Sequence, residues 1–350
     1  MKSLTFLSVV GLSALVLSAC TTGSSDAPDT AAESTSTEDA ETSEVAESPA
    51  TTISVTTTVL GSVVEQMVQC VGDESIAVEV LMPRGVDPHD YQPSSAQLAT
   101  IAESGIVVAN GLMLEESLVE PLEELESEGG VVYRMGEMVD PLPFAEIAVE
   151  GDAHDHDHDH SDEAESEEGH DGHDHGEFDP HFWLDMERVA LATEMLGEGL
   201  SELNPAFVEC GSEVASSIRD AEVEMVSILD EIPAANRVLV TDHEVMNYFA
   251  QRYDFEVAGV LIRGGSTLAE PSSQELAQLV VEIQARGLTT VFGNYHVPSD
   301  LLDAIAQESG GNVEVVPLYL GSLGEPGSGY ASYQELMLSN ARAMTQALGS

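Results

Sequence analysis

Short apolar runs rich in β-branched residues alternate with amphipathic segments of helical periodicity, and the alternation occurs in both halves of the chain. The expected strands cover 53–57, 76–82, 106–110, 131–136, 237–241, 255–261, 289–293 and 312–316. Strands that alternate with helices form parallel sheets covered by helices on both faces. We therefore predict an α/β fold of two lobes, each a parallel sheet flanked by helices.

The stretch 186–231 lies between the two halves and carries no strand pattern. It predicts two helices that are broken at Asn204-Pro205, because proline rarely continues a helix. We expect residues 205–231 to form a long, rigid linker helix between an N-terminal lobe (53–204) and a C-terminal lobe (232–350). Such a strut would limit how far the lobes can move apart.

One helix of the second half has clear start and stop signals. Ser272 with Glu275 three positions later is a capping-box pattern. The apolar residues that follow are spaced i, i+3, i+4 and i+7, and Gly287 comes just after the last of them. We predict a helix from Ser272 to Gly287.

The N-terminus has the features of a targeting segment. Residues 1–20 contain one cation, Lys2, then an apolar run that ends in "LSAC", which is typical of a lipoprotein signal peptide with Cys20 as the lipidated residue. Residues 21–52 are rich in Ser, Thr, Asp, Glu and Ala, a composition that favours a disordered tether. We expect an extracytoplasmic domain that a lipid anchor holds at the cell membrane, in the periplasm or on the outer surface.

Charge and cysteine content narrow the function further. The formal net charge is -54 and the single lysine is Lys2, so binding to nucleic acid is excluded, because phosphate contacts need cationic side chains. With Cys20 assigned to the lipid, Cys70 and Cys210 remain. In an exported protein these two cysteines either form a disulfide bond or remain free thiols, and a free cysteine is usually buried.

The tripeptide Asp-Pro-His occurs twice, in "GVDPHDY" with His89 and in "FDPHFWLD" with His181. Proline fixes its own φ and restrains the residue before it, so both histidines are expected in stiff loops. His243 follows the predicted strand 237–241. All three histidines therefore lie beyond the carboxyl ends of strands, where open parallel sheets bind ligands.

Three neutral imidazoles are a donor set that suits zinc. The alternative is that the two tripeptides are surface turns and that His243 merely begins a helix with Asp242 near its N-cap.

The segment 152–177 contains seven of the eleven histidines, alternated with aspartate and glycine. It has almost no apolar residue to bury, so we predict a disordered loop within the first lobe. It is either a solvated acidic loop without a role or a weak, multivalent metal collector. In neither case is it needed to form the main site.

Several motifs together resemble the zinc and manganese solute-binding lipoproteins of ABC transporters. They include "VLMPRGVDPHDYQPSSAQLATIAESGIVVANGLMLEESL", "DPHFWLDMERV", "LVTDHEVMNYFAQRYDFEVAGV" and "GYASYQELMLSNARAM", and the resemblance runs from about 53 to 348 in the family's order. It implies two α/β lobes joined by a rigid helix, with a metal in the interlobe cleft on His89, His181 and His243. Members that favour manganese carry a carboxylate at the position of His243, so the resemblance implies Zn²⁺ rather than Mn²⁺.

The resemblance also implies partners. They are a membrane permease and its ATPase, to which the protein, expected as a monomer, delivers the metal. The histidine-rich loop is a feature that zinc-type members share, which favours the metal collector.

One position departs from the family pattern. The family supplies a fourth ligand, an aspartate, in the loop after the last strand, and the matching residue here is Gly321. The candidates to replace it are His296, Glu325 and Asp300, and a water molecule is the remaining alternative. His296 is favoured slightly, because it again follows a predicted strand.

Two other functions fit the same residues. Three histidines and a water can form a catalytic zinc site, with Glu244 as general base of a hydrolase. No His-Glu-x-x-His pattern supports this alternative. The second alternative is a surface adhesin or metal buffer. We predict a transport protein without catalytic residues.

Overall fold

The computed structural model describes residues 51–144, 177–264, 267 and 271–349, which all fall in one compact unit, Ser48–Ser350. The predicted signal peptide with Cys20, nearly all of the predicted tether and the histidine-rich loop up to residue 176 lie outside the described residues. The first strand begins at Thr51, inside the stretch predicted as tether. Among the described residues, no helix is both long and apolar enough to cross a membrane.

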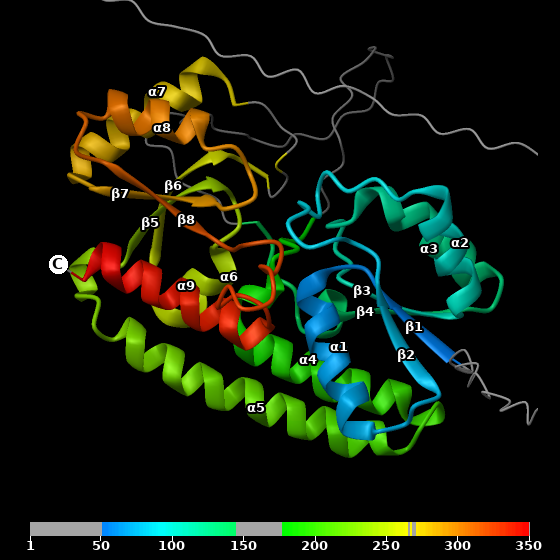
Figure 1. Cartoon of the computed structure of the whole chain (residues 1–350). Coiled ribbons are helices and arrows are strands. Elements are labelled where there is room, and N and C mark those ends of the chain that lie inside the picture. The colour runs from blue at the N-terminus through cyan, green and yellow to red at the C-terminus, as the bar shows by residue number, and fades with distance from the viewer. Residues whose placement is uncertain (1–50, 145–176, 265–266, 268–270, 350) are drawn as a thin grey trace, which may run out of the picture. The chain divides into compact units, whose positions relative to one another are not determined.

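Two four-stranded sheets, all parallel, form the framework (Figure 1). The strand orders are β2-β1-β3-β4 and β6-β5-β7-β8, so the two sheets have the same topology. The prediction of two parallel α/β lobes is confirmed. The strands are β1 Thr51–Val55, β2 Ile76–Val80, β3 Ile106–Ala109, β4 Val131–Arg134, β5 Val238–His243, β6 Glu256–Ile262, β7 Thr290–Asn294 and β8 Glu314–Leu318.

The helices lie on both faces of each sheet (Figure 1). In the N-terminal lobe α2 and α3 cover one face, and in the C-terminal lobe α7 and α8 do so. The remaining helices pack between and beneath the sheets. The helices are α1 Thr58–Val71, α2 Ser95–Ser104, α3 Val119–Ser127, α4 Met186–Gly199, α5 Ala206–Leu229, α6 Asn247–Tyr253, α7 Ser273–Arg286, α8 Asp300–Glu308 and α9 Tyr333–Leu348.

The predicted break between the two central helices is confirmed. α4 ends at Gly199, a short 3₁₀ turn follows, and α5 begins directly after Pro205. The long helix α5 contacts α1 and α4, which belong to the first half, and α9, which belongs to the second. It is therefore placed to act as the predicted strut.

The strand residues alternate between two cores, as the period of two along a strand requires. In β3, Val107 and Ala109 face the outer cluster under α2 and α3, while Val108 faces the central cluster. In β7, Val291 faces the outer cluster and Phe292 the central one. The central cluster thus takes side chains from both sheets and is continuous across the two halves.

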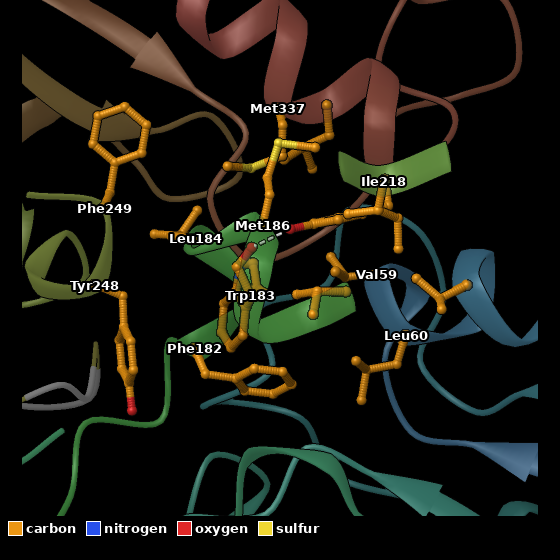
Figure 2. Packing of buried hydrophobic residues seen from close by; sticks show 14 of the residues in the cluster. Val59, Leu60, Phe182, Trp183, Leu184, Met186, Ile218, Tyr248, Phe249 and Met337 are labelled. Carbon is orange, nitrogen blue, oxygen red and sulfur yellow. Dashed lines mark hydrogen bonds between the residues drawn. The ribbon is translucent and has the colours of Figure 1, made fainter. Parts of the chain in front are cut away.

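The segment Phe182–Met186 lies in the middle of this central cluster. Figure 2 shows its residues surrounded by labelled side chains of α1, α5, α6 and α9. Trp183 is 3% exposed, its indole Nε1 donates to the carbonyl of Leu320 at 2.7 Å, and its own carbonyl accepts from the hydroxyl of Tyr333 at 2.7 Å. This packing anchors the chain directly after His181.

The alternative in which His243 begins a helix differs from the structure. β5 continues through His243, because that residue pairs with Ile262 of β6, and α6 begins only at Asn247. The predicted helix from Ser272 is confirmed, with the reciprocal capping box between Ser272 and Glu275.

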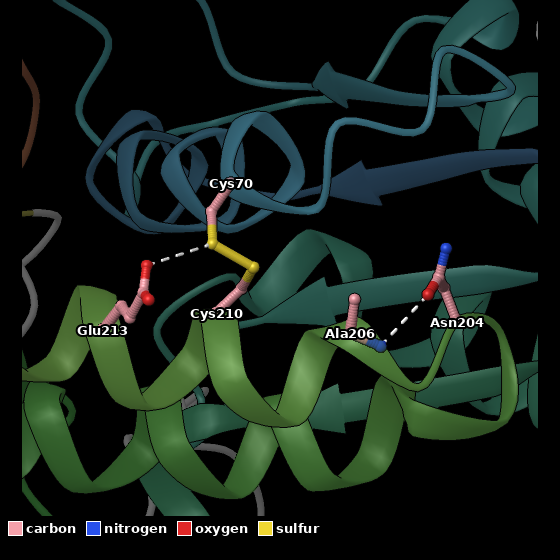
Figure 3. The surroundings of a disulfide bond; sticks show 5 residues. All are labelled: Cys70, Asn204, Ala206, Cys210 and Glu213. Atoms are coloured by element: carbon pink, nitrogen blue, oxygen red, sulfur yellow. Dashed lines mark hydrogen bonds between the residues drawn. A yellow bond between two sulfur atoms is a disulfide. The ribbon is translucent and has the colours of Figure 1, made fainter.

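Cys70 of α1 and Cys210 of α5 form a disulfide bond (Figure 3). The sulfur atoms are 2.05 Å apart and the two cysteines are separated by 140 residues in sequence. The disulfide closes a long loop and ties the N-terminal lobe to α5. In the chain-entropy account, a disulfide stabilises the fold more when the loop that it closes is longer.

Candidate metal centre

His89, His181 and His243 come together although they are far apart in sequence. One ring nitrogen of each lies within 4.8 Å of the others, and His89 Nε2 is 3.1 Å from His181 Nε2. The ring centroids are 5.2 to 5.8 Å apart. Nitrogens bound to one tetrahedral zinc at 2.0–2.1 Å stand about 3.3 Å from each other. The spacing therefore suits a single cation shared by all three rings.

The two Asp-Pro-His motifs hold their histidines by the same local hydrogen bond. Asp87 Oδ1 accepts from the backbone N–H of His89 at 3.1 Å, and Asp179 Oδ1 accepts from that of His181 at 2.9 Å. In both motifs the aspartate side chain closes a turn onto the residue two positions later. Each of the two histidines thus lies in a hydrogen-bonded turn.

His243 is held differently, as the last residue of β5. Asp242 Oδ1 accepts from the backbone N–H of His243 at 2.8 Å, and Asp242 Oδ2 accepts from the backbone N–H of Asn294 at 2.6 Å. The alternative that Asp242 caps a helix is wrong, because the N-cap residue of α6 is Met246 and has no side-chain cap.

Buried carboxylates orient two of the rings. Asp179 Oδ1 is 2.7 Å from His181 Nδ1, and Asp242 Oδ1 is 2.7 Å from His243 Nδ1. A carboxylate that accepts from Nδ1–H leaves the lone pair of Nε2 available, and metal-binding histidines commonly have such a partner. Sequence reasoning missed these two aspartates, although each stands one or two positions before its histidine.

Burial and charge set the protonation of the site. Burial raises the pKa of Asp179 to about 7. Burial, and then the charge of His243, lower the pKa of His181 well below its usual value, which favours the neutral ring that a metal needs.

His243 shows the opposite balance. Burial alone would lower the pKa of His243, but the charge and the hydrogen bond of Asp242 outweigh it and hold that pKa above its usual value. For Asp242, burial would raise the pKa, yet the charge and hydrogen bonds of His243 and the N–H of Asn294 keep it low. When the His243 ring is protonated, it has to release a proton to solvent before its nitrogen can bind a metal.

The three rings line a cavity of about 10 Å³, and its other lining residues are Asp87, Pro88, Trp183, Val245, Asn294, Leu320 and Gly321. All three histidines are at most 6% exposed. A cavity of that size has about the room of one water molecule. The site suits a small ion and excludes an organic substrate.

Position 321, where the resemblance led us to expect an aspartate, is a glycine and offers no side-chain donor. A Cβ on Gly321 would lie 3.1 Å from Pro88 Cδ, which is a tight contact. Among the described residues, none of His296, Glu325 and Asp300 joins the group of the three histidines. Glu325 and Asp300 are exposed, while the ring of His296 packs edge-on against Tyr319, with centroids 5.0 Å apart. The structure thus does not bring these candidates to the cluster.

Glu244, the candidate general base, is engaged elsewhere. Its Oε1 accepts from Asn247 Nδ2 at 3.1 Å and its Oε2 accepts from the backbone N–H of Gly264 at 3.2 Å. Both oxygens have donors and neither belongs to the ligand group. The geometry gives no support to the hydrolase alternative.

Comparison with known families places the chain. A family described as zinc-uptake complex component A, periplasmic, matches residues 53–347. The chain belongs to this family. The prediction of a zinc or manganese solute-binding lipoprotein of an ABC importer is confirmed at this level, and the family is one of transport proteins.

The relatives of this chain include proteins named as zinc-binding and proteins named as manganese-binding. The chain is 24% identical over 290 residues to zinc-binding protein TroA of Treponema pallidum, which covers 80% of this chain and 84% of the relative. It is 28% identical over 283 residues to zinc-binding lipoprotein AdcA of Streptococcus pneumoniae, of which it spans 52%. It is also 24% identical over 286 residues to manganese-binding lipoprotein MntA of Bacillus subtilis, covering 79% of this chain and 84% of the relative.

Solved structures show the same fold. The periplasmic zinc-binding protein TroA of Treponema pallidum aligns with a TM-score of 0.67 at 22% identity, over 86% of this chain and 99% of that one. At this identity the likeness shows the fold alone, and it agrees with the predicted two-lobe architecture.

Proposed function

We propose that this protein captures Zn²⁺ outside the membrane and delivers it to a membrane permease powered by an ATPase. The observation that carries the proposal is the convergence of three buried imidazoles, two from the N-terminal lobe and one from β5 of the C-terminal lobe. Membership of the zinc-uptake family supports the same role. The protein acts as a monomer and is held at the membrane by a lipid on Cys20.

The donor set favours zinc over manganese. Imidazole nitrogens suit zinc, whereas manganese prefers carboxylate, carbonyl and water oxygens. The three ligand residues are all histidines, and the carboxylates of Asp179 and Asp242 are turned to the Nδ1 atoms of His181 and His243. Some relatives of this chain are named as zinc-binding proteins and others as manganese-binding proteins. We therefore base the choice of zinc on the ligand residues of this chain.

The proposal is tested by competition between metals on purified, metal-free protein. We expect one tight equivalent of Zn²⁺ and displacement by Mn²⁺ only at a concentration more than about 100-fold higher, as the Irving–Williams order requires for nitrogen ligands. Equal affinity for the two ions would contradict the choice of zinc. In a deletion strain, slow growth that excess zinc rescues would support uptake, and normal zinc accumulation would contradict it.

The histidine-rich segment is proposed as a weak collector that is separate from the main site. Deleting residues 152–177 should leave the single tight zinc equivalent and remove weaker ones. Isothermal titration of the deleted and full chains distinguishes these classes of sites. Loss of the tight equivalent on deletion would show that the segment belongs to the main site.

A further inference from the structure

The two aspartates that orient the rings differ in what holds their second carboxylate oxygen. Asp242 Oδ2 accepts from the backbone N–H of Asn294 at 2.6 Å, and both residues lie in the C-terminal lobe. Asp179 Oδ2 accepts at 3.1 Å from Nδ2 of Asn247, the first residue of α6. Since α6 belongs to the C-terminal lobe, the side chain that holds the aspartate of the N-terminal lobe comes from the opposite lobe.

The amide of Asn247 bridges two buried carboxylates. Asn247 is 9% exposed, and its Nδ2 donates to Asp179 Oδ2 and to Glu244 Oε1, both at 3.1 Å. An ionised carboxylate only accepts hydrogen bonds, so the NH₂ end of the amide has to face both oxygens. Glu244 is itself held, because its Oε2 accepts from the backbone N–H of Gly264 at 3.2 Å. The amide therefore cannot rotate without taking this donor away from both carboxylates.

The main chain of the second Asp-Pro-His turn is also held from both lobes. Asn110, which follows β3, donates from Nδ2 to the carbonyl of Pro180 at 2.9 Å. Tyr248 of α6 donates its hydroxyl to the carbonyl of Asp179 at 2.9 Å. With two successive carbonyl groups fixed, the donors to the Asp179 carboxylate decide how it is rotated. Its Oδ1 faces Nδ1 of His181, and the donor to Oδ2 keeps it there.

We propose that Asn247 is a positioning residue of the metal centre, which aims Asp179 at Nδ1 of His181 from the opposite lobe. The inference rests on the proposed function, because it concerns the affinity of the same site. A carboxylate at Nδ1 fixes the tautomer and the orientation of a metal-binding histidine. Without the amide the carboxylate can turn away, and the Nε2 lone pair is no longer held available. His243 does not depend on such a side chain, because a backbone N–H holds its aspartate.

The first test is nuclear magnetic resonance of the histidine ring nitrogens in the metal-free protein, in mildly alkaline solution. In the unsubstituted protein we expect the ring proton of His181 on Nδ1. In Asn247→Ala we expect a mixture of both His181 tautomers, with the His243 signals unchanged. The spectra of His181→Ala and His243→Ala assign the signals. A His181 proton on Nε2 in the unsubstituted protein, or a tautomer that Asn247→Ala leaves unchanged, would overturn the inference.

Double-mutant cycles measure the effect on binding. Asn247→Ala should weaken Zn²⁺ binding about tenfold, the lower end of the effect of losing a partner of a metal ligand. In the Asp179→Asn background the effect should be smaller by at least about threefold, because the carboxylate that Asn247 positions is gone. In the Asp242→Asn background it should keep its full size. Equal weakening in all three backgrounds would refute the positioning role and leave Asn247 a structural one.

Two further variants guard against a general loss of stability. Thr193→Ala removes another buried hydrogen-bond donor, in the middle of α4, whose hydroxyl donates to the carbonyl of Val189 at 2.6 Å. It should leave the zinc affinity unchanged. Asn247→Leu fills the same space without a donor and replaces Asn247→Ala if the alanine variant does not fold. Unchanged zinc affinity in a folded Asn247→Leu variant would contradict the proposal.

Failure of this inference is distinguishable from failure of the proposed function. If the protein takes up no tight equivalent of Zn²⁺, the proposed function itself falls, while the tautomer measurement needs no metal and still decides what Asn247 does. If one equivalent binds tightly and Asn247→Ala leaves the His181 tautomer unchanged, only the role of Asn247 is refuted.

Discussion

The two lobes have the same strand order but present their histidines by different means. In the N-terminal lobe, His89 and His181 stand in Asp-Pro-His turns beyond the strands, and each aspartate accepts from the histidine N–H. In the C-terminal lobe, His243 is the last residue of β5 and pairs with Ile262. Equal topology therefore fixes the edge of the sheet where ligands gather, while the local backbone that aims each ring is free to differ.

The lobes also differ in how they are attached to α5. The N-terminal lobe is bonded covalently through Cys70 and Cys210. Near that bond α4 and α5 approach each other closely. A Cβ on Gly197 of α4 would lie only 2.6 Å from the carbonyl oxygen of Phe207 of α5. The C-terminal lobe is held by apolar packing and by bonds such as Thr345 Oγ1 to the carbonyl of Ile228 at 3.1 Å. We infer that the N-terminal lobe and α5 form the stiffer unit.

The largest effect should come from removing one ligand from either lobe. His181→Ala and His243→Ala should each weaken Zn²⁺ binding about 1,000-fold, because one ligand's share of the 10–16 kcal/mol of a zinc site is about 3–5 kcal/mol. Titration against a chelator of known affinity measures both. His296→Ala is the matched control and should change the affinity little, because His296 lies outside the ligand group. Tight binding retained by His243→Ala would mean that the N-terminal lobe alone holds the metal.

The next effect concerns the attachment of the N-terminal lobe. Replacing Cys70 and Cys210 together by serine should lower the free energy of unfolding by about 2–4 kcal/mol, the range for a native disulfide. Denaturant unfolding of the metal-free protein measures the change, and the stoichiometry of zinc binding should stay at one. Unfolding of the natural protein under reducing conditions is the control. A stability equal to that of the natural protein would show that packing alone fixes this lobe on α5.

A smaller effect should follow from changing the carboxylates that orient the rings. Asp179→Asn in the N-terminal lobe and Asp242→Asn in the C-terminal lobe should each weaken Zn²⁺ binding about 10–100-fold. The amide keeps the shape but loses the charge that stabilises the oriented imidazole. Asp300→Asn, at an exposed position, is the control and should leave the affinity unchanged. If only one of the two variants is affected, the lobes support their histidines unequally.

The smallest effect concerns two equivalent helix caps. Ser94 with Gln97 opens α2, and Ser272 with Glu275 opens α7, and both form reciprocal capping boxes. Ser94→Ala and Ser272→Ala should each lower the free energy of unfolding by about 1 kcal/mol at neutral pH. Thermal unfolding measures both variants.

The two caps should respond differently to acid. Hydrogen bonds from Ser272 lower the pKa of Glu275 below its usual value of 4.5. A carboxylate whose pKa is lowered in the folded state stabilises the fold at pH values above its usual pKa. This stabilisation is lost as the pH falls through the lowered pKa. The effect of Ser272→Ala should therefore shrink in acid, while that of Ser94→Ala should not, because Gln97 does not titrate. Identical pH profiles would contradict this assignment.

Much of the fold could be read from sequence because it depends on local pattern. The alternation of apolar runs predicted all eight strands, and the Ser272 capping box predicted the start of α7. The alternative that His243 begins a helix was wrong, because pairing of His243 with β6 extends the strand. Hydrogen bonds between strands that are distant in sequence can override a local helical pattern. A short window of sequence does not contain both strands, so it cannot reveal such bonds.

The site was predictable in part for the same reason. Proline next to His89 and His181 restricts the backbone locally, so both loops could be expected. That Glu325 stays exposed while Asn294 turns its amide to Gly321 depends on how the end of β7 and the loop after β8 pack together. Those contacts join residues far apart in the chain.

The sequence by itself determined two parallel α/β lobes, a break at Asn204-Pro205 and three histidines beyond strand ends, because propensity, periodicity and proline act over a few residues. Only the tertiary structure decided that one nitrogen of each ring lies within 4.8 Å of the others. It also decided that Cys70 meets Cys210 across 140 residues. The physical reason is that the packing of a continuous core between the sheets sets these distances, and that packing is a property of the whole chain.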